Sequence, residues 1–182
     1  MLAYQSGLAA AGNQLMWFDR TGNRLDVLGD PAQYGNLELS PDGKRASISL
    51  PEPGKGRDIW LFDIARGLRT RFTFDPAEAL SSIWSPDGSH IVFNSRRKGH
   101  LDLYQKASNG SGAEELLLEN NFDKYPNSWS PDGRYILYSS NEAGNVAAED
   151  LFVLPLSGDR KPIPFLNTKF DEAPGRFSPD AV

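Results

Sequence analysis

The sequence predicts an all-β protein, a β-propeller built from four repeats of about 45 residues that each fold into a four-stranded antiparallel blade. The first observation is a motif, Ser-Pro-Asp-Gly, that begins at Ser40, Ser85 and Ser130 and returns without its glycine at Ser178. These starts lie 45, 45 and 48 residues apart, and a period of about 40–45 residues is typical of propeller blades. The second observation is composition: six Tyr, ten Phe and four Trp favour strands, while seventeen Gly and thirteen Pro indicate many turns.

The chemistry of the motif predicts a tight turn between the first and second strands of each blade. Proline fixes φ near that of a type I turn, aspartate accepts the next position, and glycine can adopt the left-handed conformation that closes the hairpin. Because the same residues recur in every repeat, they cannot all form one active site, and we assign them to structure. The copies are Ser40, Pro41, Asp42, Gly43; Ser85, Pro86, Asp87, Gly88; Ser130, Pro131, Asp132, Gly133; and Ser178, Pro179, Asp180.

The remaining strands follow each turn in a fixed order. Short apolar segments at 46–50, 91–95 and 136–140 predict the second strands, and no apolar period of 3.6 residues is long enough for a helix. The third strands open with an acidic residue, and glycine-bearing turns lead to the fourth. We expect these acidic residues to be structural: Asp58, Asp102 and Asp150. We expect the four tryptophans to pack between blades: Trp17, Trp60, Trp84 and Trp129.

The phase of the repeats predicts how the ring closes. We expect a single domain, 1–182, whose repeat units are approximately 1–44, 45–89, 90–134 and 135–182. This phase leaves the first strand of one blade at the C-terminus and its three outer strands at the N-terminus, so that pairing them would close the ring. We expect two chains to join head to tail into an eight-bladed homodimer. A compact four-bladed monomer and an open arc are the alternatives.

Composition and motifs exclude several classes of function. A net charge of −5 argues against a nucleic-acid-binding protein, and no apolar run approaches the ~18 residues of a membrane-spanning helix. The first residues lack the basic and apolar regions of a secretory signal. The chain has no cysteine and two histidines, His90 and His100, without metal-ligand spacing, so we expect no metal and no cofactor. The run 110–112, Gly-Ser-Gly, does not match the spacing of a hydrolase nucleophile elbow.

Several segments resemble a known family. The Ser-Pro-Asp-Gly turns, "DIWLFDIARG" and "RFTFDPAE" resemble TolB-like propeller repeats, which are relatives of WD repeats. "NQLMWFDRTGNRL", "LSPDGKR", "EELLLE", "LPLSGDRKPIPFLNT" and "GRFSPD" are similar to the propeller attached to certain bacterial serine/threonine protein kinases. The chain lacks the kinase motifs themselves. The resemblance implies a binding scaffold and, in bacteria, an extracytoplasmic location.

Two sets of residues are candidates for binding, on the side of the blades opposite the motif turns. The first is a set of repeated carboxylates that could ring the central opening and attract cations or a basic peptide: Asp30, Asp75, Asp123 and Asp171. The alternative is that each Asp caps a turn while the phenylalanines before the last three, Phe74, Phe122 and Phe170, pack between blades. The second set is a mixed aromatic and charged patch: Tyr34, Arg96, Arg97, Lys98, His100, Lys124 and Tyr125. Its alternative is a set of solvated loop tips.

The predicted function is a non-catalytic scaffold that binds an unidentified protein, peptide or small ligand through its loops or its central channel. The alternative is the accessory propeller of a hydrolase-type or lyase-type enzyme, whose active residues would line the channel and show perturbed pKa values.

Overall fold

The computed structural model describes residues 2–6, 12–141, 149–172 and 174–180. Within these ranges the chain forms fifteen β-strands and no helix, which confirms the all-β prediction. The strands make four separate antiparallel sheets, and within each sheet every strand pairs with the next one along the chain.

The first sheet has three strands and the second has four. The strands of the first sheet are β1 (Leu2–Ser6), β2 (Asn13–Phe18) and β3 (Arg24–Ala32). The strands of the second sheet are β4 (Leu37–Leu39), β5 (Arg45–Glu52), β6 (Gly56–Asp63) and β7 (Leu68–Arg71).

The third and fourth sheets have four strands each. Those of the third are β8 (Ala79–Trp84), β9 (His90–Ser95), β10 (Asp102–Ala107) and β11 (Glu115–Leu118). Those of the fourth are β12 (Lys124–Trp129), β13 (Tyr135–Ser140), β14 (Asp150–Pro155) and β15 (Ile163–Leu166).

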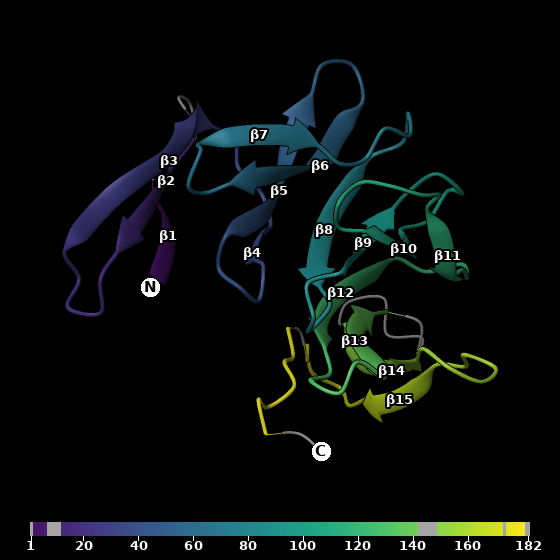
Figure 1. The fold of residues 1–182 in the computed structure, drawn as a ribbon. Coiled ribbons are helices and arrows are strands. Elements are labelled where there is room, and N and C mark those ends of the chain that lie inside the picture. The colour runs from purple at the N-terminus through teal and green to yellow at the C-terminus, as the bar shows by residue number, and fades with distance from the viewer. Residues whose placement is uncertain (1, 7–11, 142–148, 173, 181–182) are drawn as a thin grey trace.

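The four sheets follow one another along an arc, with the first sheet at one end and the fourth at the other (Figure 1). The first strands of the second, third and fourth sheets lie toward the middle of this arc, and β8 contacts both β4 and β12. The arrangement is that of successive propeller blades.

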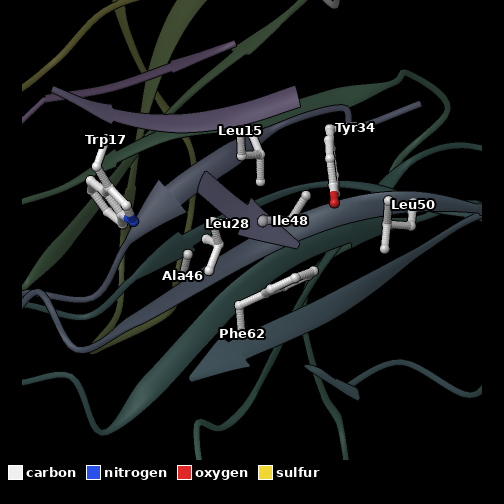
Figure 2. Close-up of a cluster of buried hydrophobic side chains, with 8 residues drawn as sticks. All are labelled: Leu15, Trp17, Leu28, Tyr34, Ala46, Ile48, Leu50 and Phe62. Carbon is white, nitrogen blue, oxygen red and sulfur yellow. The ribbon is translucent and has the colours of Figure 1, made fainter. Parts of the chain in front are cut away.

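The hydrophobic core is divided among the spaces between successive sheets. Figure 2 shows the first cluster, in which Leu15, Trp17 and Leu28 of the first sheet meet Ile48 and Phe62 of the second. A second cluster joins the second and third sheets, and a third joins the third and fourth. All four tryptophans lie in or against these clusters, which confirms the prediction that they pack between blades.

Strand β9 shows how one strand serves two clusters. Ile91 and Phe93 face the second sheet, whereas Val92, between them, faces the fourth. Successive side chains of a strand point to opposite faces, so a blade buried on both faces needs an uninterrupted apolar run. The segment 91–93 is such a run, and all three side chains are fully buried.

The three complete Ser-Pro-Asp-Gly motifs occupy the turns β4–β5, β8–β9 and β12–β13 with the same hydrogen bonds. The glycine N–H donates to the serine carbonyl at 2.8–2.9 Å in each, and the glycines have φ of 67°, 70° and 77°. The serine hydroxyl donates to the aspartate carboxylate at 2.6–2.7 Å. The turn is therefore closed by its own side chains as well as by its backbone.

The split blade is visible at one end only. The first sheet has the three strands that the repeat phase predicts for the N-terminus. Residues 174–180 form no strand; instead Arg176 pairs with Glu38 on β4, and the Phe177 N–H donates to the Ser128 hydroxyl at 3.2 Å. Among the described residues this segment makes no ladder with β1–β3, so ring closure stays a prediction.

Candidate functional site

The strand order of the sheets defines a surface that we call the loop face. In each four-stranded sheet, the motif turn and the turn between the third and fourth strands lie at one end. The loop between the second and third strands and the segment leading to the next sheet lie at the opposite end. The loop face consists of these latter segments: 53–55, 72–78, 96–101, 119–123 and 167–172.

Three phenylalanines at equivalent repeat positions are exposed on the loop face. Phe74 and Phe170 are each 65 % exposed and Phe122 is 37 % exposed. The expectation that they pack between blades is therefore wrong. The carboxylate of the aspartate that follows each one accepts a backbone hydrogen bond, which agrees with the expectation that each Asp caps a turn or loop. The acceptor–donor pairs are Asp75 with the Ala77 N–H, Asp123 with the Leu101 N–H and Asp171 with the Glu149 N–H.

Arg96 links the third sheet to the loop that enters the fourth. Its Nε lies 2.9 Å from Glu78 and its Nη2 lies 3.0 Å from Asp123. His100 also approaches Asp123, with 3.6 Å between Nδ1 and Oδ1. Partial burial opposes ionisation of Asp123, but the Leu101 N–H and Arg96 together hold its pKa below the ordinary value.

The adjacent basic residues are also paired. Arg97 lies 2.6 Å from Glu114 and 3.7 Å from Asp75, and its guanidinium stacks 4.1 Å from the centre of the Tyr104 ring. Lys98 lies 2.7 Å from Glu119. Two members of the predicted carboxylate set therefore form ion pairs with two members of the predicted basic patch, Asp75 with Arg97 and Asp123 with Arg96.

Two predicted patch residues lie inside the protein. Tyr34 is 4 % exposed, and its hydroxyl donates to the backbone carbonyl of Asp30. Lys124 is fully buried, with its Nζ 2.7 Å from the buried carboxylate of Asp102. Neither offers its side chain to a partner, because each satisfies a polar group of its own chain. Tyr125 is half-buried, which raises its pKa, while Asp30 and Asp171 are exposed.

The acidic residues near the start of the third strands are buried in all three four-stranded sheets. Asp58 pairs with Lys55 at 2.9 Å and with Arg71, and it accepts the Thr73 hydroxyl at 2.9 Å. Asp102 pairs with Lys124. Burial and the nearby Glu172 raise the pKa of Asp150. Sequence spacing located these aspartates but not their partners, since the cations come from different positions in each repeat.

An open pocket lies between the third and fourth sheets at the loop face. Its volume is about 580 Å³, within the usual range of small-ligand sites. Its lining is Leu118, Glu119, Asn120, Phe152, Pro162, Pro164 and Asn167. None of these seven was predicted as a site residue, because the pocket exists only where the outer strands of two blades meet.

The described residues contain no group of three or more His, Cys, Asp or Glu side chains placed to hold a metal ion. Within the same ranges, no helix has the length and apolar character needed to cross a membrane.

Comparison with known proteins identifies relatives of the repeat. The profile of a family described as the TolB beta propeller domain matches residues 15–182. The Tol-Pal system protein TolB of Helicobacter pylori is 30 % identical over 82 residues, which are 44 % of this chain and 19 % of that protein. The chain spans less than a third of the curated relatives that it matches.

Solved structures share the fold. TolB from Acinetobacter baumannii superposes with a TM-score of 0.79 at 24 % identity, covering 98 % of this chain and 43 % of that one. The tricorn protease gives a TM-score of 0.58 at 17 % identity, covering 85 % of this chain and 16 % of that one. At these identities the likeness concerns the fold alone.

Proposed function

The chain belongs to the TolB beta propeller domain family, and we propose that it is a non-catalytic scaffold that binds a protein or peptide partner through its loop face. The observation that carries this proposal is the exposure of Phe74, Phe122 and Phe170 at one position of three repeats. Large aromatic side chains are enriched at the centres of protein interfaces, and burying each one removes a large apolar area from water.

The surroundings of these phenylalanines support the same function. The loops between them are fixed by ion pairs and aspartate caps, so that little conformational entropy remains to be lost on binding. The pocket lined by Leu118, Phe152, Pro162 and Pro164 adds a recess with apolar walls, which suits an apolar side chain of an extended peptide.

The experiment is a selection of a random peptide library against the protein. The selected peptides are then measured against a triple variant, Phe74→Ser, Phe122→Ser and Phe170→Ser. We expect the triple variant to lose at least about tenfold in affinity, since hot-spot aromatics contribute about 2 kcal/mol or more. The control is Leu68→Ser, which removes a side chain 62 % exposed at the opposite end of a sheet. Equal loss in both variants would contradict a site on the loop face.

We propose further that the four sheets are part of a larger ring. The first sheet, at one end of the arc, has three strands, and the fourth sheet lies at the other end, so two copies could complete one another head to tail. The sequence resemblance also implies an extracytoplasmic location and a relation to kinase-attached propellers. Fractionation of the source cells would test the location.

The alternative function, an accessory propeller of a hydrolase-type or lyase-type enzyme, has weaker support. The two histidines lie at opposite ends of the third sheet, His90 beside the motif turn and His100 on the loop face. Ser111 donates to Asn109 at 2.7 Å, within the same turn. Turnover of chromogenic peptide substrates by the purified protein would favour the alternative.

A further inference from the structure

We propose that Asp150 and Glu172 form the centre of a calcium-binding site, at the position where the preceding repeat holds a lysine ammonium. This proposal does not depend on partner binding by the exposed phenylalanine side chains.

The preceding repeat shows what occupies this position when a cation is supplied by the chain. Lys124 Nζ lies 2.7 Å from Asp102 Oδ1, 2.6 Å from the Phe122 carbonyl and 3.3 Å from the Asn120 carbonyl. Both charged side chains are buried. The ammonium is therefore enclosed by one carboxylate and two carbonyl oxygens, all from the third sheet and the loop that follows it.

The repeat places Asp150 and Glu172 at the same two positions. The motif starts Ser130 and Ser178 are 48 residues apart, and the same interval takes Asp102 to Asp150 and Lys124 to Glu172. Strand pairing agrees, since Asp102 lies opposite Ser95 and Asp150 lies opposite Ser140, the last residues of β9 and β13. The chain thus keeps the carboxylate and replaces the ammonium with a second carboxylate.

The loop that supplies the carbonyl oxygens keeps its shape. In the third repeat unit the Phe122 N–H donates to Asn120 Oδ1 at 3.1 Å. In the next, the Phe170 N–H donates to Thr168 Oγ1 at 3.2 Å. By this equivalence the carbonyls of Thr168 and Phe170 correspond to those that enclose the lysine ammonium.

The arginine that pairs with the equivalent aspartate of the second sheet is also replaced. In the second sheet Asp58 pairs with Arg71, which lies opposite Trp60 on the neighbouring strand. The corresponding pair in the fourth sheet is Pro164 opposite Phe152. Among the described residues, no lysine or arginine forms an ion pair with Asp150 or Glu172.

The oxygen atoms at this position lack partners in the described structure. Asp150 is fully buried, and neither of its carboxylate oxygens accepts a hydrogen bond; the same holds for Glu172 Oε2 and for the hydroxyl of Ser140. A buried carboxylate without compensation is costly. Two carboxylates in place of an ion pair lower the local charge by two, which is the charge of one divalent cation. Calcium binds carboxylate, carbonyl and hydroxyl-type oxygens in flexible geometry, whereas magnesium requires a strict octahedron and retains water.

Thermal unfolding of the protein tests the site, in EDTA, in calcium chloride and in magnesium chloride at equal ionic strength. We expect calcium to raise Tm by about 2–6 °C and magnesium to raise it less, as for a ligand that binds only the folded state. Glu172→Lys restores the residue type found at position 124, so its Tm in EDTA should exceed that of the wild type and should no longer respond to calcium. Asp150→Asn should also abolish the response.

The matched control is Asp159→Asn, which removes an exposed carboxylate and makes the same change in net charge as Asp150→Asn. It should keep the full calcium response. If Asp150→Asn does not fold, Glu172→Lys and Glu172→Gln decide the outcome. A calcium response that persists in the Glu172 variants would overturn the proposal, as would a wild-type protein stabilised by acid but not by calcium, because the carboxylates would then share a proton instead.

Discussion

Within each motif turn, a serine hydroxyl holds an aspartate in its ionised form. The Ser85 hydroxyl donates to Asp87 at 2.6 Å and accepts the His90 N–H at 2.9 Å. Hydrogen bonds from Ser85 and from Ser89 lower the pKa of Asp87 to about 2. The turn is thus predictable from four letters of sequence because the hydrogen bonds that close it lie within six residues.

The glycine of this turn should tolerate no β-branched residue. Gly88 has φ of 70°, and a Cβ atom added there would meet only Pro41 at 3.7 Å, so the restriction comes from the backbone conformation and not from crowding. We expect Gly88→Val to lower the free energy of unfolding by about 1 kcal/mol or more, measured by urea denaturation. Gly88→Asn is the control and should lose less, since asparagine adopts the left-handed conformation more readily. An unchanged midpoint in the valine variant would refute the turn assignment.

The lowered pKa of Asp87 makes part of the stability depend on pH. The folded-state pKa lies below the unfolded value of about 3.9, so this stabilisation is present above about pH 4 and is lost as pH falls toward 2. Asp87→Asn removes the ionisable group. The difference in unfolding free energy between wild type and variant should therefore shrink between about pH 5 and pH 2.5. A constant difference would show that the pKa of Asp87 is not lowered in the folded state.

Between elements, the structure departs from what the sequence could predict. Strand β9 was recognisable from local pattern, since Ile91, Val92 and Phe93 form an apolar run bounded by a turn. The burial of Lys124 and the exposure of Phe74 were not, because both depend on which loop of the next repeat lies against which strand. A lysine at the start of a strand is ordinarily solvated, and only the buried Asp102 beside it changes that expectation.

Removing the lysine of this pair should be severe. Lys124→Met leaves Asp102 buried without a cation, and we expect a loss of about 3–5 kcal/mol in the free energy of unfolding. The double variant, Lys124→Met with Asp102→Asn, should recover much of that loss because no buried charge remains. Chemical denaturation of the wild type, both single variants and the double variant measures the coupling. Additive losses would contradict a direct ion pair.

For the whole molecule, the repeat interval predicted four successive sheets, and the structure contains them. The closure of the ring could not be predicted from the repeat interval. The strand that would complete the first sheet can come from the same chain or from a second copy, and the interval is the same in both cases. The binding surface on the loop face stays a prediction, and the exposure of Phe74, Phe122 and Phe170 there was known only from the structure.

The mass of the protein in solution tests the proposed ring. Light scattering on a sizing column should give a mass near twice 20.1 kDa if two chains complete one another. A mass near 20.1 kDa would contradict the homodimer. Small-angle scattering would then distinguish an open arc from a compact closed form.

The division of the core into separate clusters has a consequence for how the protein unfolds and how such chains grow. Each cluster couples one sheet only to its neighbour, so stability should behave as a sum over adjacent pairs, as in a linear array. Amide hydrogens of the two end sheets should then exchange with solvent before those of the middle sheets. For the same reason, duplication of one 45-residue unit adds a sheet whose two faces already match those beside it, so a gene can lengthen the array without redesigning its interior.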